Sequence, residues 1–453
     1  MLERLEFKHL GPSPAMELRF GERLNLLTGD NGLGKTFVLD AAWWALTRTW
    51  AEGRMLLPDP RPDVVSSIAY EVRGKAGQRT KVKSEFDFGE AEDWKLPRGK
   101  KPMPGLVIYA RVDGGFSVWD PARNYWRETE QDSSVGRRAP LAFHFNRRQI
   151  WNGLWRTEKD EYEKNKDALV CRGLLEDVVS WQHDPEEVAA RDLLASVVAE
   201  LSPRDNPGDR ERAPLAFGSP GEMLGRTGKV PMLKVPYSTE PIPLELASAG
   251  VRRIVALAYA LVWAWVAHRK AVVQKKGLAT AAHQIVFLFD EIEGHLHPQW
   301  QRRILPALLR ALGSLGGKEL PVQIIGTTHA PLVLASVETE FNEESDRLFH
   351  FALTKQNAVT LERVPWAPQG DALNWLVSET FGLRQARSVE GERVVEAAEA
   401  WMRGDLAALP PGLQSAEAID TQLRRVLADN DRFKPRWSMA QAMQRPPASQ
   451  QRR

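Results

Sequence analysis

The chain has 453 residues, of which 43% are hydrophobic and 26% are charged, and this is the composition of an ordinary globular protein. Its 61 basic and 59 acidic side chains leave a net charge of +2, which is too small to indicate nucleic-acid binding by itself. Basic residues cluster locally at 98–101, 268–270 and 451–453, a pattern typical of solvated surface. A single cysteine, Cys171, excludes an internal disulfide framework and agrees with a reducing, cytoplasmic location.

The sequence does not predict a membrane protein. The longest apolar run covers residues 254–267 and has basic residues on both sides. It is shorter than the roughly 20 residues that a membrane-spanning helix needs, so it predicts a buried helix. The N-terminus leads directly into a strand-like pattern, without the charged and apolar segments of a signal peptide.

The first 150 residues combine short strand patterns with one helix. Residues 2–28 alternate between short strand patterns and turns, and a helix that is apolar nearly all round is expected over residues 34–49. Such a helix is typical of one that lies beneath a sheet. Strands are expected at residues 24–28, 65–73, 80–88, 105–112, 115–119 and 140–146.

Residues 150–240 are polar and irregular. A helix is expected at 185–201 and a flexible stretch near 203–213. No heptad pattern is sustained in this region, so a long coiled-coil arm is not expected.

From residue 244 onward the pattern is more regular. Helices are expected at 249–269 and 298–313, and apolar strands at 285–290 and 322–327. Apolar strands that alternate with helices predict a mostly parallel sheet covered on both faces. Short helices are expected over 366–405, and the tail after about 430 is expected to be disordered, since it is rich in Gln, Pro and Arg.

One glycine-rich segment carries a nucleotide-binding pattern. Residues 29–36, called the phosphate loop below, read Gly-Asp-Asn-Gly-Leu-Gly-Lys-Thr and match G-x-x-x-x-G-K-[ST] in full. Backbone N–H groups at Asn31, Gly32 and Gly34 are expected to point at phosphate oxygens. Lys35 is expected to neutralise the β- and γ-phosphates of ATP, and the Thr36 hydroxyl to hold Mg²⁺. A chance glycine turn is disfavoured, because the pattern follows a strand and opens a helix.

Two carboxylates follow the apolar strand that begins at residue 285. These are Asp290 and Glu291. Carboxylates at the carboxyl end of a central strand face the ligand crevice in open α/β sheets. Asp290 is expected to hold Mg²⁺ through a water, and Glu291 to orient and polarise the water that attacks the γ-phosphate.

Together these motifs resemble the ABC ATPases, in the branch that contains RecF, SMC-like and OLD-type proteins. The resemblance covers roughly residues 1–50 and 140–340. In this family a signature segment at the start of a helix touches the γ-phosphate of a nucleotide held by the opposite subunit. Residues 247–250, Ala-Ser-Ala-Gly, stand at that place, so the resemblance assigns this contact to Ser248 and Gly250. The segment lacks the family's usual leucine and second glycine, and Ser248 as a plain helix N-cap is the alternative.

The resemblance also assigns His329 and Gln149. His329 follows the strand at 322–327 and stands where the family carries its switch histidine, which contacts the γ-phosphate. Gln149 is the candidate for the glutamine that senses Mg²⁺ and the attacking water.

Residues 293–298, Glu-Gly-His-Leu-His-Pro, are similar to the RecF and OLD branch rather than to transporter ATPases. A zinc site at His295 and His297 is disfavoured, because no convincing third ligand accompanies them.

The expected fold is therefore α/β, a P-loop NTPase with an ABC-type core. This core is a mostly parallel sheet with flanking helices, to which an antiparallel β subdomain and a helical subdomain are added. The expected parts are an N-terminal half with the phosphate loop and β subdomain (1–150), a helical insert leading to the signature (151–248), a C-terminal half of the core (249–365), and a helical extension with a flexible tail (366–453).

The resemblance implies an ATPase that converts ATP and water to ADP and phosphate with Mg²⁺, as a homodimer that closes around two ATP molecules. Its expected role is a conformational switch acting with a partner effector protein or on DNA in bacterial antiphage defence. A RecF-like DNA repair ATPase is the alternative, and a transporter subunit is a weaker one. A nuclease domain of the OLD type is not expected, because only residues 429–431 offer an Asp-x-Asp pair and no strand precedes them.

Overall fold

The structure is a computed structural model. It describes residues 1–61, 64–89, 92–95, 103–124, 142–159, 165–183, 187–202, 214–274, 281–317 and 320–444. The chain separates into two compact units, Met1–Ala372 and Leu373–Arg453, which are treated separately. The first three expected parts all lie in the first unit, so the divisions between them remain predictions.

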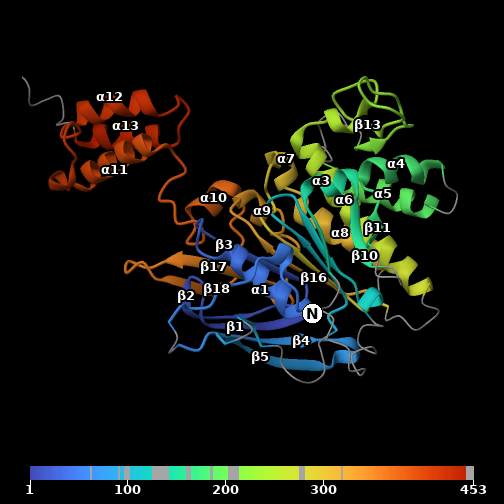
Figure 1. The fold of residues 1–453 in the computed structure, drawn as a ribbon. Helices are drawn as coiled ribbons and strands as arrows, with labels where there is room; N and C mark the ends of the chain where they lie inside the picture. The colour runs from blue at the N-terminus through green and yellow to red at the C-terminus, as the bar shows by residue number, and fades with distance from the viewer. Residues whose placement is uncertain are drawn as a thin grey trace, which may run out of the picture. The chain divides into compact units, whose positions relative to one another are not determined.

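An eight-stranded sheet forms the centre of the first unit (Figure 1). Its strand order is β18-β17-β3-β16-β15-β7-β8-β9, and the five strands from β17 to β7 run parallel. Only the strands at the two edges, β18 at one and β8 and β9 at the other, pair antiparallel. The prediction of a mostly parallel sheet is therefore confirmed. The strands are β3 (Leu24–Gly29), β7 (Leu106–Ala110), β8 (Phe116–Trp119), β9 (Ala142–Phe145), β15 (Ile285–Phe289), β16 (Val322–Thr327), β17 (Arg347–Leu353) and β18 (Val359–Val364).

A second, antiparallel sheet covers one side of this core. Its order is β2-β1-β4-β5-β6, and helix α1 (Lys35–Thr47) contacts strands of both sheets. Trp43 and Trp44 of α1 are almost completely buried in the shared hydrophobic core, which explains why this helix is apolar nearly all round. The strands are β1 (Leu2–Leu10), β2 (Ser13–Arg19), β4 (Ser67–Arg73), β5 (Arg79–Asp87) and β6 (Asp93–Trp94), and short 3₁₀ turns lie at η1 (Ala51–Gly53) and η2 (Lys75–Gly77).

Helices gather beyond the other face of the central sheet (Figure 1). The longest, α6 (Ala249–Gln274), contacts β7 and helices α5 and α8. Among the described residues it alone is long and apolar enough to cross a membrane, but 67% of that stretch is buried within the protein. This burial agrees with the buried helix predicted at 254–267. The remaining helices are α3 (Arg147–Asn152), α4 (Leu174–His183), α5 (Val188–Leu201), α7 (Pro298–Gln301), α8 (Ile304–Gly316) and α9 (Pro331–Ala335), with the 3₁₀ turn η5 (Leu244–Leu246).

Several elements differ from the sequence prediction. The single helix expected at 298–313 is divided, because Arg303 has a non-helical φ of −137° between α7 and α8. A two-stranded hairpin, β10 (Leu154–Lys159) and β11 (Asn165–Cys171), lies in the region predicted to be irregular. A small sheet of β12 (Ala216–Phe217), β13 (Met232–Lys234) and β14 (Ile242–Pro243) follows. The expected flexible stretch near 203–213 lies outside the described residues.

The C-terminal elements are helical, as expected. They are α10 (Ala372–Val377), α11 (Val389–Arg403), η6 (Leu406–Ala408), α12 (Ala416–Val426) and α13 (Phe433–Gln444). The prediction of disorder after about residue 430 is wrong for α13, because Phe433 and Trp437 are buried in the core of this unit. The indole N–H of Trp437 donates to Asp420 Oδ1 at 3.0 Å, which fixes α13 against α12.

Candidate nucleotide site

The phosphate loop has the backbone shape that its glycines permit. Gly29, Gly32 and Gly34 have φ values of 124°, 78° and 101°, all in the left-handed region. A Cβ on Gly29 would lie 2.1 Å from the Phe351 carbonyl oxygen, and one on Gly34 would lie 2.5 Å from a Pro12 side-chain carbon. A side chain at either position would therefore displace the loop.

The loop leads directly into the N-terminus of α1. In this described segment no side chain caps the helix, so its first N–H groups stay available to an anion. Asn31, Gly32 and Thr36 are exposed at the tip of the loop and the start of the helix. Phosphate binding by these residues remains a prediction, and their exposure leaves room for a phosphate.

Lys35 folds back over the loop. Its Nζ donates to the carbonyl oxygens of Gly29 at 2.9 Å and Asp30 at 2.6 Å. Burial lowers the pKa of Lys35 to about 8, and the negative charges of Asp30 and Asp290 oppose this shift. The ammonium group lies where phosphate oxygens could replace the carbonyl oxygens as its partners.

Asp290, which directly follows β15, is joined to the phosphate loop and to β16 by hydrogen bonds from two hydroxyl groups. The Thr36 hydroxyl donates to Asp290 at 2.9 Å, and the Thr327 hydroxyl donates to the same carboxylate at 2.7 Å. Asp290 is 1% exposed, and its burial raises its pKa while both hydroxyl bonds lower it. The structure thus brings Thr36 and Asp290 together, and their hydroxyl and carboxylate oxygens are ligands that Mg²⁺ prefers.

The backbone of Glu291 is held on two sides. Its N–H donates to Thr327 Oγ1 at 2.7 Å, and its carbonyl accepts a bond of 3.2 Å from Arg253 of α6. Its φ of 47° lies in the left-handed region, which is costly for a non-glycine residue. The carboxylate forms no hydrogen bond with any described residue, so it is available to a water.

Sequence reasoning treated Glu293 only as part of a branch marker. In the structure its carboxylate accepts the Thr328 hydroxyl at 2.7 Å and the His329 N–H at 2.5 Å. Glu293 therefore fixes the turn that carries His329. The sequence signal was its place two residues after Glu291, which could not show where its carboxylate points.

His329 lies beside the phosphate loop. Burial lowers the pKa of its imidazole, the positive charge of Lys35 acts in the same direction, and a hydrogen bond with the Gly29 backbone opposes both. A neutral imidazole is therefore favoured next to the loop at neutral pH.

A further, half-buried carboxylate was missed. Asp40 lies on α1 four residues after Thr36, hence on the same helix face, and accepts the Tyr109 hydroxyl at 3.0 Å. Burial raises the pKa of Asp40 to about 6, and the charge of Asp290 contributes in the same direction. Helical spacing from Thr36 was the signal that could have identified it.

The signature segment stands at the N-terminus of α6. The Val251 N–H donates weakly to Ser248 Oγ at 3.4 Å, so Ser248 acts as a helix cap, and it is exposed. A Cβ on Gly250 would lie 3.2 Å from the His295 carbonyl oxygen, so little space exists there. The contact of Ser248 and Gly250 with the opposite subunit's nucleotide remains a prediction.

Gln149 has another role in this structure. Its side-chain oxygen accepts from the Asn146 N–H at 2.9 Å, and the Asn146 side chain accepts from the Gln149 N–H at 2.9 Å, which forms a capping box on α3. Within the described residues no hydrogen bond joins Gln149 to Thr36 or Asp290. The expected contact with Mg²⁺ would require this capping box to open.

The two histidines of residues 293–298 show no metal-binding arrangement. No group of three or more His, Cys, Asp or Glu side chains among the described residues could hold a metal ion. His297 Nδ1 instead accepts from the Gln299 N–H at 3.3 Å and caps α7.

Residues 156–335 match the family model described as "AAA domain, putative AbiEii toxin, Type IV TA system". The match includes the acidic strand β15 and the strand β16, and the phosphate loop that meets their ends precedes it. The match covers less than half of the chain. In the central sheet the phosphate loop lies at the carboxyl end of β3 and Asp290 at that of β15, and β16 lies between these two parallel strands.

Three other similarities are weaker. A protein of Methanopyrus kandleri named DNA double-strand break repair Rad50 ATPase is 33% identical over 109 residues, which cover 21% of this chain and 12% of that protein. An SMC head domain solved with the C-terminal domain of ScpA, derived from Pyrococcus furiosus, aligns over 80% of this chain and 96% of its own, with 13% identity and a TM-score of 0.41. The recombination mediator RecF with a bound ATP analogue aligns over 77% and 95%, with 10% identity and a TM-score of 0.36. The nucleotide site is therefore assigned from its own geometry rather than from these similarities.

Proposed function

We propose that the chain binds Mg·ATP at the phosphate loop and hydrolyses it to ADP and phosphate. The observation that carries this proposal is the 2.9 Å hydrogen bond between Thr36 and Asp290, which lie 254 residues apart in the sequence. Two motifs that each predict nucleotide chemistry thus meet at one point, next to the buried ammonium group of Lys35.

The same residues support a hydrolytic step. Lys35 and the N–H groups at the start of α1 bind the phosphates and offset their charge. Glu291 orients the attacking water and accepts its proton as the water oxygen bonds to the γ-phosphorus. The bond from that phosphorus to the β–γ bridging oxygen breaks, and ADP leaves with the electron pair. Mg²⁺, held by Thr36 and Asp290, would supply charge neutralisation at the phosphates.

We further infer that hydrolysis drives a switch. Two subunits would close around two ATP molecules, with Ser248 and Gly250 of each contacting the γ-phosphate held by the other. Loss of this phosphate would release the pair. The bound nucleotide would thus control whether the two subunits are closed or apart.

Two roles for this switch are supported by different comparisons. The matched family model is described as a putative AbiEii toxin of a type IV toxin–antitoxin system, which favours a bacterial defence role with a partner effector. The partial match to a protein named as a DNA repair ATPase favours a RecF-like role on DNA. Binding of duplex DNA by the purified protein alone, weakening steeply with salt, would support the repair role. A transporter subunit is least supported, because residues 293–298 are unlike the transporter pattern.

The test of the core proposal is phosphate release and ATP binding by purified protein. Lys35→Ala is expected to lose ATP binding, because the buried ammonium partner of the phosphates is removed. Glu291→Gln is expected to bind ATP but to hydrolyse it about 100-fold or more slowly, as loss of a general base does. Lys83→Ala serves as the control, since Lys83 is exposed on β5. Wild-type turnover by Glu291→Gln would overturn the assignment of the base.

A further inference from the structure

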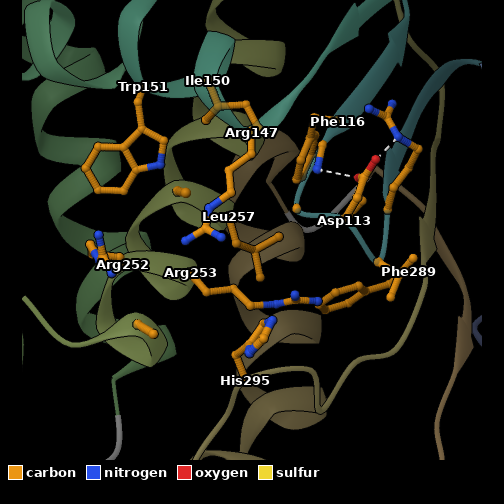
Figure 2. A pocket seen from close by; sticks show the side chains of 17 residues that line it. Asp113, Phe116, Arg147, Ile150, Trp151, Arg252, Arg253, Leu257, Phe289 and His295 are labelled. Atoms are coloured by element: carbon orange, nitrogen blue, oxygen red, sulfur yellow. Dashed lines mark hydrogen bonds and ion pairs between the residues drawn. The ribbon is translucent and has the colours of Figure 1, made fainter. Parts of the chain in front are cut away.

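A cavity of about 110 Å³ lies between the end of β7, helix α3 and the first turns of α6 (Figure 2). Arg147 and Trp151 reach it from α3, and Arg252 and Arg253 reach it from α6. Of the described residues that line it, none belongs to the phosphate loop. The cavity therefore adjoins the candidate ATP site through Arg253 without including the phosphate loop, and its function is not explained by hydrolysis.

The cavity carries positive charge without a compensating partner. Among the described residues, neither the Arg147 nor the Arg252 guanidinium forms an ion pair, and Arg252 Nε is buried without a hydrogen-bond partner. Burial lowers the pKa of Arg253, the negative charges of Glu291 and Glu293 oppose this shift, and the like charge of Arg147 adds to it. Leaving a buried donor unsatisfied is destabilising, and an anionic ligand would remove this penalty.

The other charged groups of the lining are already paired. Arg111 donates to Ser117 at 2.6 Å and to Glu52, and its Nε lies 3.5 Å from Asp113. Asp113 also accepts from the Gly115 N–H at 2.7 Å, as Figure 2 shows. The Asp113 carboxylate is thus paired with Arg111 and the Gly115 N–H, and not with Arg147 or Arg252.

The remaining walls are aromatic and aliphatic. Phe116 of β8, Trp151 of α3 and Leu257 of α6 line the space. An apolar cavity of about 150 Å³ can hold one benzene ring, and this cavity of about 110 Å³ is of a similar scale. Aromatic side chains bind such rings by stacking, and guanidinium groups bind phosphate through paired N–H donors.

A second, larger hollow shares part of its lining with this cavity. It has a volume of about 440 Å³ and shares Arg147, Trp151 and Arg252 with the first, and Arg148 also lines it. The one acid among its described lining residues, Glu245, is paired with Arg226. The shared arginines therefore stand at the junction, where a phosphate attached to a ring in the inner cavity would lie. The outer hollow leaves room for a chain that continues from this phosphate.

We propose that this cavity is a second nucleotide site, which binds a pyrimidine nucleoside monophosphate unit. The ring packs against Trp151, and the phosphate is held between Arg147 and Arg252. The unit is either a free nucleotide or one residue of a single-stranded nucleic acid. Arg252 lies four residues after Ser248 on α6, so occupancy of the site acts on the helix that carries the signature segment.

The test uses the full chain carrying Lys35→Ala, so that the phosphate loop does not bind the probe. Thymidine monophosphate and thymidine are titrated by calorimetry, and a fluorescein-labelled dT12 strand is followed by anisotropy. Arg147→Ala, Arg252→Ala and Trp151→Ala are each added, and Arg384→Ala is the control because Arg384 is exposed in the second unit. Arg147 is exposed, so its replacement does not disturb the hydrophobic core.

Binding of thymidine monophosphate or of dT12 is expected, with a loss of at least tenfold in affinity for each cavity variant and none for Arg384→Ala. Binding of the monophosphate alone identifies a free nucleotide, and binding of the strand alone identifies a nucleic acid. The proposal is overturned if neither probe binds, if the cavity variants bind as the control does, or if poly-L-glutamate displaces dT12 as well as thymidine monophosphate does. Because Lys35 is absent throughout, each of these results is independent of whether the chain hydrolyses ATP.

Discussion

Asp290 connects the residues of the candidate ATP site. A carboxylate that is 1% exposed would be costly alone, and hydroxyl bonds from Thr36 and Thr327 offset this cost. Thr327 also accepts the Glu291 N–H, so one hydroxyl fixes both acidic residues. Thr36 is exposed, so its oxygen can turn to a metal ion while Thr327 continues to hold the carboxylate.

The buried ammonium group of Lys35 predicts a pH dependence of ATP binding. The folded-state pKa of Lys35 is about 8, below its ordinary value of 10.5, so the free protein loses this charge as the pH rises through about 8. Phosphates favour the charged form, so binding above this pH requires uptake of a proton. The affinity for Mg·ATP is expected to be constant from pH 6.5 to 7.5 and to fall by up to about tenfold per pH unit above 8.

Calorimetry in buffers of different ionisation enthalpy would measure both the affinity and the proton uptake. Uptake should rise between pH 7.5 and 9, since a growing fraction of the free protein has an uncharged Lys35. A constant affinity with no proton uptake up to pH 9.5 would contradict this prediction. It would show that Lys35 is not partly deprotonated in the free protein, or that it does not contact the phosphates.

At the scale of single residues, the sequence identified those candidate residues that belong to continuous motifs. The phosphate loop, Asp290 and Glu291 are recognisable because each motif is continuous and follows an apolar strand. Glu293 and Arg253 were not identified, because their partners lie on another strand or helix and only the folded chain brings them together. Gln149 was assigned by resemblance, and its capping of α3 shows that a local hydrogen bond competes with the expected metal contact.

At the scale of elements, helix α6 joins three features: the signature segment at its start, Arg253 beside Glu291, and the walls of the arginine-lined cavity. Because these three features lie on one continuous helix, a displacement of its N-terminus is expected to reach Arg253 and the cavity walls. Ser248 can act there as a cap, as a phosphate ligand, or as both.

Replacing Ser248 by Asp separates these roles. Aspartate is as good an N-cap as serine, so the stability of the protein should change by less than about 1 kcal/mol. Its negative charge would repel the γ-phosphate of a facing nucleotide, so hydrolysis should fall at least tenfold while ATP binding to the phosphate loop persists. Thermal unfolding, ATP binding and phosphate release would be compared with Ser388→Asp, at the N-cap of α11. Unchanged hydrolysis in Ser248→Asp would assign Ser248 to capping alone.

The elements that the sequence predicted well have strong periodic or apolar signals. Strands β15 and β7 are buried at every residue, and α1 and α6 are long and apolar. The hairpin of β10 and β11 was missed because its strands are largely polar, and no sheet face imposes an apolar alternation on them. Helix α13 was missed because its composition is polar and only two large side chains, Phe433 and Trp437, fix it.

At the scale of the whole molecule, the single chain leaves the candidate ATP site open. Asn31, Gly32 and Thr36 are exposed, and so is the signature segment residue Ser248. A phosphate bound to the loop would thus be covered only when a second surface closes over it. A second copy of the chain offers that surface through its own α6 N-terminus, whose partial positive charge favours an anion.

Glu291→Gln is therefore expected to accumulate as a closed dimer in Mg·ATP. The substitution replaces a carboxylate by an amide, which removes the base and one negative charge that faces the γ-phosphate. ATP therefore stays intact and continues to bridge the subunits. Size-exclusion chromatography with light scattering should show a shift from about 51 kDa to twice that mass on addition of Mg·ATP. Adding Lys35→Ala or Ser248→Asp to this variant should abolish the shift, since one removes the nucleotide and the other repels it across the interface. A mass that ATP does not change would separate hydrolysis from dimer closure, and the cross-subunit role of Ser248 would then be wrong.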